Sequence, residues 1–180
     1  KEKFIEGTIP NKVDIVIGNP PYVQIRNIRK EKIKAYQQNL ETAEDRFDLF
    51  SLFVEKGIKF LNDNGKLGYI ISNTLLTNDV LLPIREYILN TCIIEEIVDL
   101  GGGVFEEANV NTVIIILKKE KNKEKRDNNS IKIVTKTDDS GKIIRSHTIK
   151  QKTFLENPLK RFIIVRKSNK IGFNTWFMRG

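Results

Sequence analysis

The strongest constraint on the fold is an apolar run that is stopped by two consecutive prolines. Val13–Gly18 (VDIVIG) is rich in β-branched residues and is followed directly by Asn19-Pro20-Pro21-Tyr22. A short run of this kind that ends in a turn signal is typical of a buried parallel strand. Two prolines fix successive φ angles, and Pro21 keeps Pro20 out of the helical region. We therefore predict a strand that ends in a rigid, extended turn.

Downstream of this turn, helical and strand patterns alternate. Apolar residues recur at helical spacing over 48–61, and we expect Asn62-Asp63-Asn64-Gly65 to end that helix with Gly65 at positive φ. The further expected elements are a strand over 66–72, a helix over 81–89 with Pro83 in its first turn, and strands over 93–100 and 111–117. This order predicts a mostly parallel α/β sheet. The last two strands lie too close in sequence for a helical crossover, so we expect them to be antiparallel.

The rest of the chain is more polar. Residues 118–126 (KKEKNKEKR) form a charge run that predicts an exposed turn, and 131–135 with 142–147 predict a β-hairpin. The patterns divide the chain into three parts: an α/β part over 1–119, a charged turn and β-hairpin extension over 120–156, and a basic linker over 157–180.

The charge balance favours a polyanionic partner. The chain holds 31 Lys+Arg against 23 Asp+Glu, a formal net charge of +8. Two stretches are notably basic, 26–34 and 158–180, and each is either a set of phosphate contacts or an ordinary solvated face. The first is expected to be a mobile loop or a short helix.

The single cysteine, Cys92, excludes an internal disulfide framework, suits a reducing cytosol and is expected to be buried filler. No apolar run approaches the length of a membrane span. We therefore expect a cytoplasmic protein without membrane contact. The chain starts at Lys1 without a methionine and ends at Gly180 without a polar tail, which predicts a piece of a longer protein.

The Asn19-Pro20-Pro21-Tyr22 turn suits one kind of chemistry. Open α/β sheets bind ligands at the carboxyl ends of their strands, where this turn is expected to lie. The exocyclic amine of adenine is a poor nucleophile because its lone pair is delocalised into the ring. An Asn side-chain oxygen and a backbone carbonyl that each accept one N–H favour localising that lone pair. Tyr22 supplies a ring on which the base can stack. The simpler interpretation is a strand-ending turn without chemistry.

With these segments in view, the chain resembles the N6-adenine DNA methyltransferases of restriction–modification systems. The resemblance is to the subgroup in which the cofactor site comes first, NPPY second and target recognition last. VDIVIGNPPYV is similar to the catalytic strand and loop, DLFSLFVEKGIKFLNDNGKLGYIIS to the following helix and strand, and IIEEIVDLGGGVFEEANVNTVIIILKK to the terminal hairpin. It covers about residues 9–119 and implies a fold: the C-terminal half of a Rossmann-like methyltransferase sheet, mostly parallel with a terminal antiparallel hairpin, followed by a β-hairpin and linker. The resemblance makes 1–119 the catalytic half of the methyltransferase domain and 157–180 a linker into a truncated target-recognition region.

The same resemblance implies roles for individual residues. Asn19 and the Pro20 carbonyl match the acceptors of the target amine, and Tyr22 matches the ring that stacks on the adenine extruded from the duplex. Phe105 matches a second aromatic residue on that base. Phe53 matches a ring that packs against the adenine of S-adenosylmethionine, and Asn19 also lies beside this cofactor. Double-stranded DNA is the implied partner, with a specificity or nuclease domain or subunit as a further one.

The chain departs from the family at the cofactor site. The glycine-rich loop and the acid that hold S-adenosylmethionine are not present, so we expect the cofactor half to lie upstream of Lys1. A chain that starts here is expected to bind the cofactor weakly or not at all.

Several residues have simpler interpretations. Phe53 lies on the apolar face of its helix and suits a core role equally well. Asp48 is expected to be an N-cap, although substrate contact is the alternative, and Asp14 is expected to be structural. Gly101–Gly103 are a flexible connector rather than a phosphate loop, because neither a helix nor GKS follows. His147 has no triad or metal partner nearby in sequence.

Three other functions share the chemistry or the charge. Enzymes that methylate a glutamine amide in proteins also use NPPY, and RNA adenine methylation is a further option. A non-catalytic module that only binds DNA belongs to a different class, and intact Asn19 argues against it.

Overall fold

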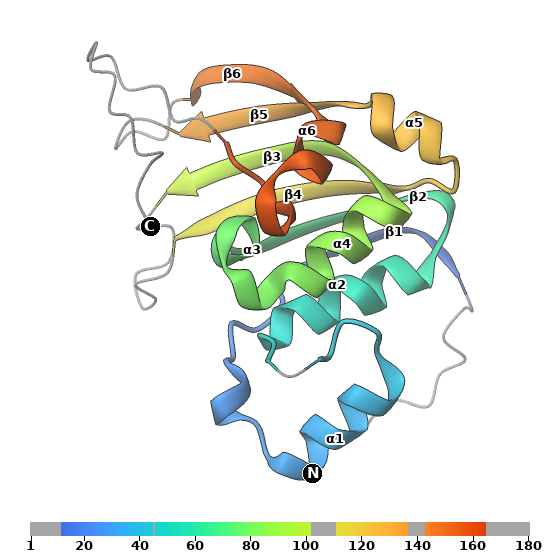
Figure 1. Ribbon diagram of the computed structural model, residues 1–180, viewed down its shortest axis with the longest axis vertical. Helices are drawn as coiled ribbons and strands as arrows, with labels where there is room; N and C mark the ends of the chain where they lie inside the picture. Colours follow the sequence, from blue (N-terminus) through green and yellow to red (C-terminus); the bar gives the residue numbers. More distant parts are fainter. Residues whose placement is uncertain (1–11, 45, 102–110, 137–142, 165–180) are drawn as a thin grey trace.

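In the computed structural model, which describes residues 12–44, 46–101, 111–136 and 143–164, the strands form one six-stranded sheet (Figure 1). In their order across the sheet the strands are β1 (Val13–Gly18), β2 (Leu61–Ser72), β4 (Thr112–Lys119), β3 (Cys92–Gly101), β5 (Ser130–Lys136) and β6 (Ile143–Lys150). The helices are α1 (Lys30–Asn39), α2 (Leu49–Phe60), α3 (Thr74–Thr77), α4 (Leu82–Thr91), α5 (Lys123–Asn128) and α6 (Gln151–Glu156), with 3-10 turns η1 (Ile25–Asn27), η2 (Asp79–Leu81) and η3 (Pro158–Lys160).

The strand directions confirm the predicted α/β fold, and the sheet is mixed, with two parallel and three antiparallel pairings. β1 and β2 are parallel, β3 and β4 are antiparallel as expected, and β5 and β6 form the expected hairpin. β5 also pairs in parallel with β3, so the hairpin continues the same sheet. The division of the chain into three parts stays a prediction. β1, β2, β3 and β5 all run in one direction, which follows from their pairings.

Helix α2 begins at Leu49 and ends at Phe60, close to the predicted limits. Its Phe50, Val54 and Ile58 side chains are buried against the sheet. The predicted cap at Gly65 is wrong, because β2 starts immediately at Leu61 and the positive φ, 64°, belongs to Asn64. An asparagine tolerates this left-handed conformation better than most residues.

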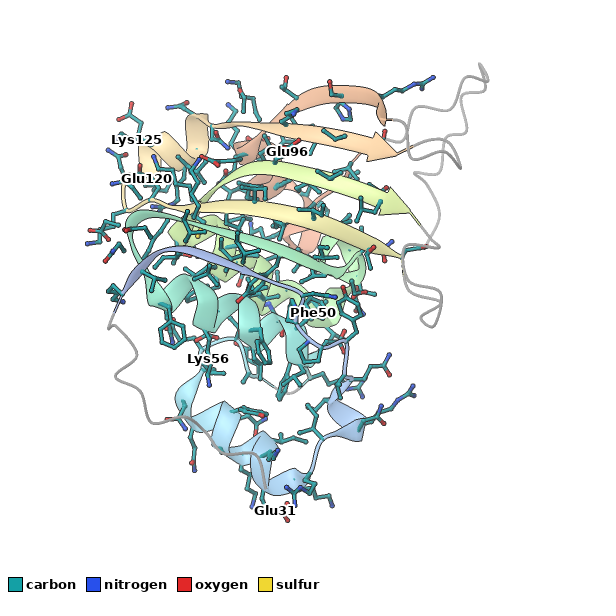
Figure 2. All side chains as sticks on the ribbon, turned by 180° about the vertical axis from the view of Figure 1, so that it is seen from behind. Glu31, Phe50, Lys56, Glu96, Glu120 and Lys125 are labelled. Atoms are coloured by element: carbon teal, nitrogen blue, oxygen red, sulfur yellow. The ribbon has the colours of Figure 1, made fainter. Side chains whose placement is uncertain are left out.

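Helices α2, α3, α4 and α6 all cover one face of the sheet, as Figures 1 and 2 show from opposite sides. Side chains on that face, such as Leu67, Ile71 and Ile115, are fully buried. The other face carries an apolar stripe that crosses β1, β2, β4 and β3 and stays partly exposed. Its members, which lie on one face by register, are Ile15, Ile17, Ile70, Ile114, Ile116 and Val98.

The prediction that Val13–Gly18 forms a buried strand is therefore wrong in one respect. β1 is an edge strand of the described sheet, and its Ile15 and Ile17 side chains are 65% and 81% exposed. Parallel strands are normally covered on both faces by helices. In the described part of the chain, no helix covers this second face.

Two charged segments contain regular structure. Residues 26–34 overlap η1 and contain the start of α1, so the helical alternative holds. The predicted exposed turn over 118–126 is wrong in part, because it contains the end of β4 and the start of α5. Arg126 is buried and donates hydrogen bonds to the carbonyls of Leu89, Glu120 and Lys121, which satisfies its charged head inside the protein. None of the described helices is both long and apolar enough to cross a membrane.

Candidate functional site

The Asn19-Pro20-Pro21-Tyr22 turn follows the last residue of β1, beside the end of the parallel strand β2. This is the edge of an open α/β sheet at which ligands bind. Pro20 is buried and anchors the turn, whereas Asn19 and Pro21 are exposed. The sequence thus places a fixed backbone and an accessible amide side chain at the same point.

Tyr22 contacts Asn19 within this turn. The Tyr22 hydroxyl donates a hydrogen bond to Asn19 Oδ1 at 2.7 Å and lies 3.2 Å from the Ile70 carbonyl oxygen. Burial raises the pKa of Tyr22, so the hydroxyl keeps its proton at neutral pH. The Asn19 oxygen is therefore oriented as an acceptor, and the ring of Tyr22 is held at the turn.

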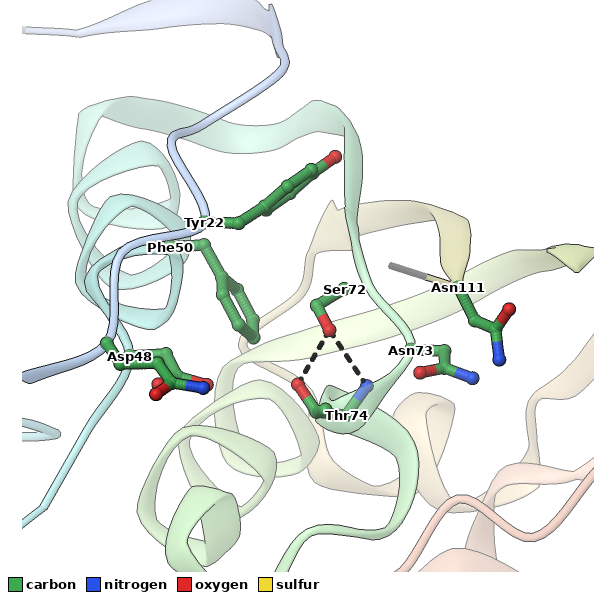
Figure 3. A pocket seen from close by; sticks show the side chains of 8 residues that line it. Tyr22, Asp48, Phe50, Ser72, Asn73, Thr74 and Asn111 are labelled. Atoms are coloured by element: carbon green, nitrogen blue, oxygen red, sulfur yellow. Dashed lines mark hydrogen bonds between the residues drawn. The ribbon is translucent and has the colours of Figure 1, made fainter. Parts of the chain in front are cut away.

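Two hollows flank the turn. The first, which we call the tyrosine-side hollow, has a volume of about 300 Å³ (Figure 3). It is lined by Tyr22, Gln24, Asp48, Phe50, Ser72, Asn73, Thr74 and Asn111. The second, the Phe53-side hollow, has a volume of about 260 Å³ and is lined by Ile17, Gly18, Asn19, Pro20, Pro21, Phe53 and Tyr69.

Asp48 contributes an acid to the tyrosine-side hollow. It stands at the N-cap position of α2, as predicted, but its side chain caps no backbone N–H. Instead the carboxylate lines the hollow beneath Tyr22 and Phe50 (Figure 3), and burial raises its pKa. The Asp48 backbone still serves the helix start, because its carbonyl accepts a hydrogen bond from Ser51 Oγ at 2.7 Å. Its carboxylate is thus available to a ligand.

The opposite wall of this hollow is polar and fixed by hydrogen bonds. Ser72 Oγ accepts from Thr74 Oγ1 at 2.9 Å and from the Thr74 amide at 3.3 Å (Figure 3). The backbone amide of Asn73 donates a hydrogen bond to the backbone carbonyl of Asn111 at 2.9 Å, which joins the end of β2 to the start of β4. Sequence reasoning missed this wall. Its signal was the position of Ser72, Asn73 and Asn111 at strand ends, where side chains from separate segments converge.

The Phe53-side hollow is mainly apolar. Phe53 is 42% exposed and lines the hollow, so it is not the core residue that its helical position also allowed. Helix α2 approaches β2 closely because Gly57 has no side chain: a Cβ there would lie 2.5 Å from Leu67 Cδ1 and 2.9 Å from the Tyr69 hydroxyl. Gly57 therefore brings Phe53 towards the turn.

The other candidate residues are placed as follows. Phe105 lies outside the described residues, as do Gly102 and Gly103, so their expected roles stay predictions. Cys92 is buried, as expected, and burial raises its thiol pKa to about 11. His147 Nε2 is buried without a hydrogen-bond partner among the described residues. No group of three metal-binding side chains is found in the part of the chain that the structure describes.

Comparison with protein families gives a match over more than half of the chain. The model of the Eco57I restriction-modification methylase family matches residues 1–105 of the 180. Among individual relatives, type II methyltransferase M.BstVI of Geobacillus stearothermophilus is 37% identical over 89 residues, which are 49% of this chain and 16% of that protein. Type II methyltransferase M.XhoI of Xanthomonas vasicola is 30% identical over 124 residues, or 68% of this chain and 23% of that protein. The chain thus spans less than a quarter of the length of either relative.

Solved structures agree on the fold. The methyltransferase subunit of a type I restriction-modification system from Streptococcus thermophilus superposes with a TM-score of 0.60 at 17% identity. The match covers 87% of this chain and 39% of that one. The type IIG restriction endonuclease BpuSI superposes with a TM-score of 0.59 at 19% identity, covering 82% of this chain and 20% of that one.

Proposed function

The chain belongs to the Eco57I restriction-modification methylase family, and we propose on this basis that it carries the catalytic part of an enzyme that methylates N6 of adenine in double-stranded DNA. The methyl donor is S-adenosylmethionine, as in the S-adenosylmethionine-dependent methyltransferase from Listeria monocytogenes that shares the fold. The names of two relatives combine restriction enzyme and methyltransferase, so a nuclease or specificity part is a proposed partner.

The observation that carries the proposal is the acceptor geometry at Asn19. Its Oδ1 already accepts a hydrogen bond from the Tyr22 hydroxyl at 2.7 Å, and the residue lies exposed on a turn fixed by two prolines. Asn19 Oδ1 and the Pro20 carbonyl would each accept one N–H of the adenine amine. The amine nitrogen would then be placed to take the donor's methyl group, its new N–C bond replacing the methyl's bond to sulfur, and it would release one proton to solvent. Positioning, rather than a strong base, supplies the catalysis.

The Phe53-side hollow is the proposed cofactor side. When bound, S-adenosylmethionine supplies an electrophilic methyl group. Phe53 offers an exposed ring for its adenine, and Asn19 lies on the same hollow. The other lining residues include no acid for the ribose hydroxyls. We propose that the groups for the ribose and the amino-acid end come from outside the described residues, mainly from other parts of the whole protein. We propose that these parts add at the free edge of β1 and cover Ile15 and Ile17.

The tyrosine-side hollow is the proposed base side. Chemistry on N6 requires the adenine to leave the duplex, which costs a few kcal/mol. Stacking on an aromatic ring returns about 1–3 kcal/mol per base. Tyr22 supplies one such ring, and Phe105 is proposed to supply a second. The polar wall of Asp48, Ser72 and Asn73 offers hydrogen-bonding partners for the edge of the extruded base.

The test is a methyl-transfer assay on the whole protein that contains this chain. Labelled S-adenosylmethionine is offered with duplex DNA, with RNA, or with a release-factor peptide that contains glutamine, and the product is identified by mass spectrometry. We expect N6-methyladenine in the duplex, abolished by Asn19→Ala while DNA binding persists. Asn90→Ala, an exposed asparagine on α4 at the opposite end of the sheet, is the matched control and should keep full activity.

Each other outcome contradicts the proposal in a defined way. Label on the glutamine peptide or on RNA would assign the same chemistry to a different substrate. Duplex binding without any transfer would favour the non-catalytic module. Full activity in Asn19→Ala would remove Asn19 from the mechanism.

A further inference from the structure

Residues 24–48 leave the tyrosine-side hollow and return to it, forming what we call the arm. Gln24 and Asp48 pair as an isolated antiparallel bridge, and the Leu49 amide donates to the Val23 carbonyl at 2.8 Å. Both Gln24 and Asp48 line the hollow. The arm therefore begins and ends at the proposed entrance of the extruded base, while α1 projects away from the sheet (Figure 1).

The arm is held as an ordered unit by a small core of its own. Its buried residues are Leu40, Ala43 and Phe47, which pack with Leu52 of α2. Tyr36 of α1 meets Phe47 edge to face at 6.3 Å between ring centroids. Such a core fixes α1 against the returning segment, so the arm is not a free loop.

A buried carboxylate ties the arm to α2. The Glu55 side chain is fully buried and accepts hydrogen bonds from the Glu41 amide at 3.0 Å, the Thr42 amide at 2.9 Å and Thr42 Oγ1 at 2.7 Å. Lys59 supplies the countercharge at 2.6 Å. Charge-assisted hydrogen bonds of this kind are among the stronger ones in proteins. The position of the arm is thus set before any ligand binds.

The first part of the arm, residues 26–34, is basic. Its five cations are all exposed: Arg26, Arg29, Lys30, Lys32 and Lys34. The returning part of the arm is mixed in charge, with Arg46 beside the exposed acids Glu41 and Glu44. Across the described part of the chain none of the five cations of 26–34 forms an ion pair, although seven exposed or half-exposed cations elsewhere do: Lys59, Lys66, Lys121, Lys123, Lys125, Lys132 and Arg161. Glu31 is the one acid within 26–34. The cations of the arm therefore keep their full attraction for an anion.

From this placement we propose that the arm binds the sugar–phosphate backbone of duplex DNA beside the base that enters the tyrosine-side hollow. The inference rests on the proposed function and adds a contact to it. Arg26 follows Gln24 by two residues, so its Cα lies within about 7 Å of that of Gln24, which lines the hollow. Lys30 and Lys34 follow at intervals of four, which places both on one side of α1. Because the arm is ordered in advance, binding loses little conformational entropy.

Phosphate contacts hold a protein on DNA without reading sequence. They also release counterions, so each contact adds about 0.9 to the slope of log affinity against log salt. This dependence separates the arm from the catalytic residues, which act on one base. The arm should therefore control the affinity and its salt dependence, and leave the chemistry at Asn19 unchanged once DNA is bound.

The experiment compares two triple variants of the whole protein that remove the same charge. The test variant is Arg26→Gln, Lys30→Gln, Lys34→Gln. The control is Lys121→Gln, Lys123→Gln, Lys125→Gln, exposed lysines around α5 at the opposite end of the sheet from the hollow. Duplex binding is measured by fluorescence anisotropy over a salt series. We expect the slope to fall by about 2–3 in the test variant and by less than about 0.5 in the control. A third variant that keeps the charge, Arg26→Lys, Lys30→Arg, Lys34→Arg, should retain the wild-type slope.

The outcomes separate the inference from the proposed function. Equal loss in both glutamine variants, or a wild-type slope in the test variant, overturns the arm contact while DNA methylation by the wild type still upholds the function. A lower salt slope in the charge-keeping variant also overturns the arm contact, because binding would then depend on the shape of these side chains rather than on their charge. Tighter binding to RNA than to duplex DNA assigns the arm to another partner. A wild type that neither binds nor methylates DNA removes the function and the inference together.

Gln matches Lys in helix propensity, and circular dichroism checks that the variants keep α1.

Discussion

The Tyr22 hydroxyl donates a hydrogen bond to Asn19 Oδ1 at 2.7 Å. The residue proposed to stack on the target base is therefore already bonded to the atom proposed to accept the amine of that base. An amide oxygen has two lone pairs, so Asn19 Oδ1 can accept the amine N–H beside the tyrosine O–H or in its place. Where the hydroxyl gives way, the Ile70 carbonyl, 3.2 Å from it, is its other acceptor.

Two substitutions at Tyr22 separate its ring from its hydroxyl. Tyr22→Phe removes the competing donor and keeps the ring, so methyl transfer should stay within about threefold of wild type. Tyr22→Ala removes stacking worth about 1–3 kcal/mol, which lowers kcat/KM by about 5- to 150-fold. Steady-state kinetics on duplex DNA measures both. Equal damage from the two changes would show that the hydroxyl, and not the ring, is the functional part.

Asp48 predicts a pH-dependent stability. Burial raises its carboxyl pKa, so folding favours the neutral form. The stability that this form contributes is present below the unfolded pKa of about 3.9 and is lost as the pH rises through the folded pKa. Asp48→Asn should therefore unfold at higher urea than wild type at neutral pH, and the gap should close in acid. Asp63→Asn is a control of opposite sign, because the hydrogen bond from Lys121 lowers the Asp63 pKa. Parallel pH profiles for wild type and Asp48→Asn would contradict the burial argument.

Glu55→Gln should loosen the arm without removing its positive charges. Burial raises the Glu55 pKa, but hydrogen bonds from Lys59, Thr42 and Glu41 outweigh it and leave the pKa lowered. The carboxylate therefore stabilises the fold above its unfolded pKa, and that stability disappears as the pH falls through the folded value. The substitution should cost about 2 kcal/mol at neutral pH. Hydrogen exchange should speed up over 41–47, and DNA affinity should drop with an unchanged salt slope.

The control for this change is Glu86→Gln, an exposed glutamate on α4. It should leave stability, exchange and affinity as in wild type. If Glu55→Gln also leaves the exchange over 41–47 unchanged, Glu55 is not the anchor of the arm.

The sequence predicts best what depends on neighbouring residues in the chain. The end of β1 follows from two prolines after a β-branched run, and α2 follows from apolar residues at helical spacing. The hairpin of β5 and β6 is also local. These elements need no knowledge of what lies across the sheet.

Features that depend on distant residues escaped prediction. Arg85 and Glu55 are charged, which indicates the surface, yet both are buried. Arg85 donates to the carbonyls of Leu75, Asn78 and Leu159, partners up to 74 residues away. Asp48 fits an N-cap by type, but its side chain turns into the hollow. Residue type sets what a side chain can bind, and only the tertiary structure sets what it meets.

The uncovered face of the sheet gives the last prediction. Ile15 is 65% exposed on β1 and stays clear of both hollows, so it reports on coverage of that face alone. In the isolated 180-residue chain, Ile15→Lys should change the free energy of unfolding by no more than about 0.5 kcal/mol. If the rest of the whole protein packs on this face, the same change there buries an unpaired charge and should cost several kcal/mol. Val80→Lys, an exposed apolar residue on the helical side, should be neutral in both. Because a cofactor half that covers β1 would be displaced by the lysine, S-adenosylmethionine affinity measured by calorimetry should fall with stability in the whole protein. An Ile15→Lys variant as stable in the whole protein as in the isolated chain would mean that the face stays open, and the cofactor half would have to attach elsewhere.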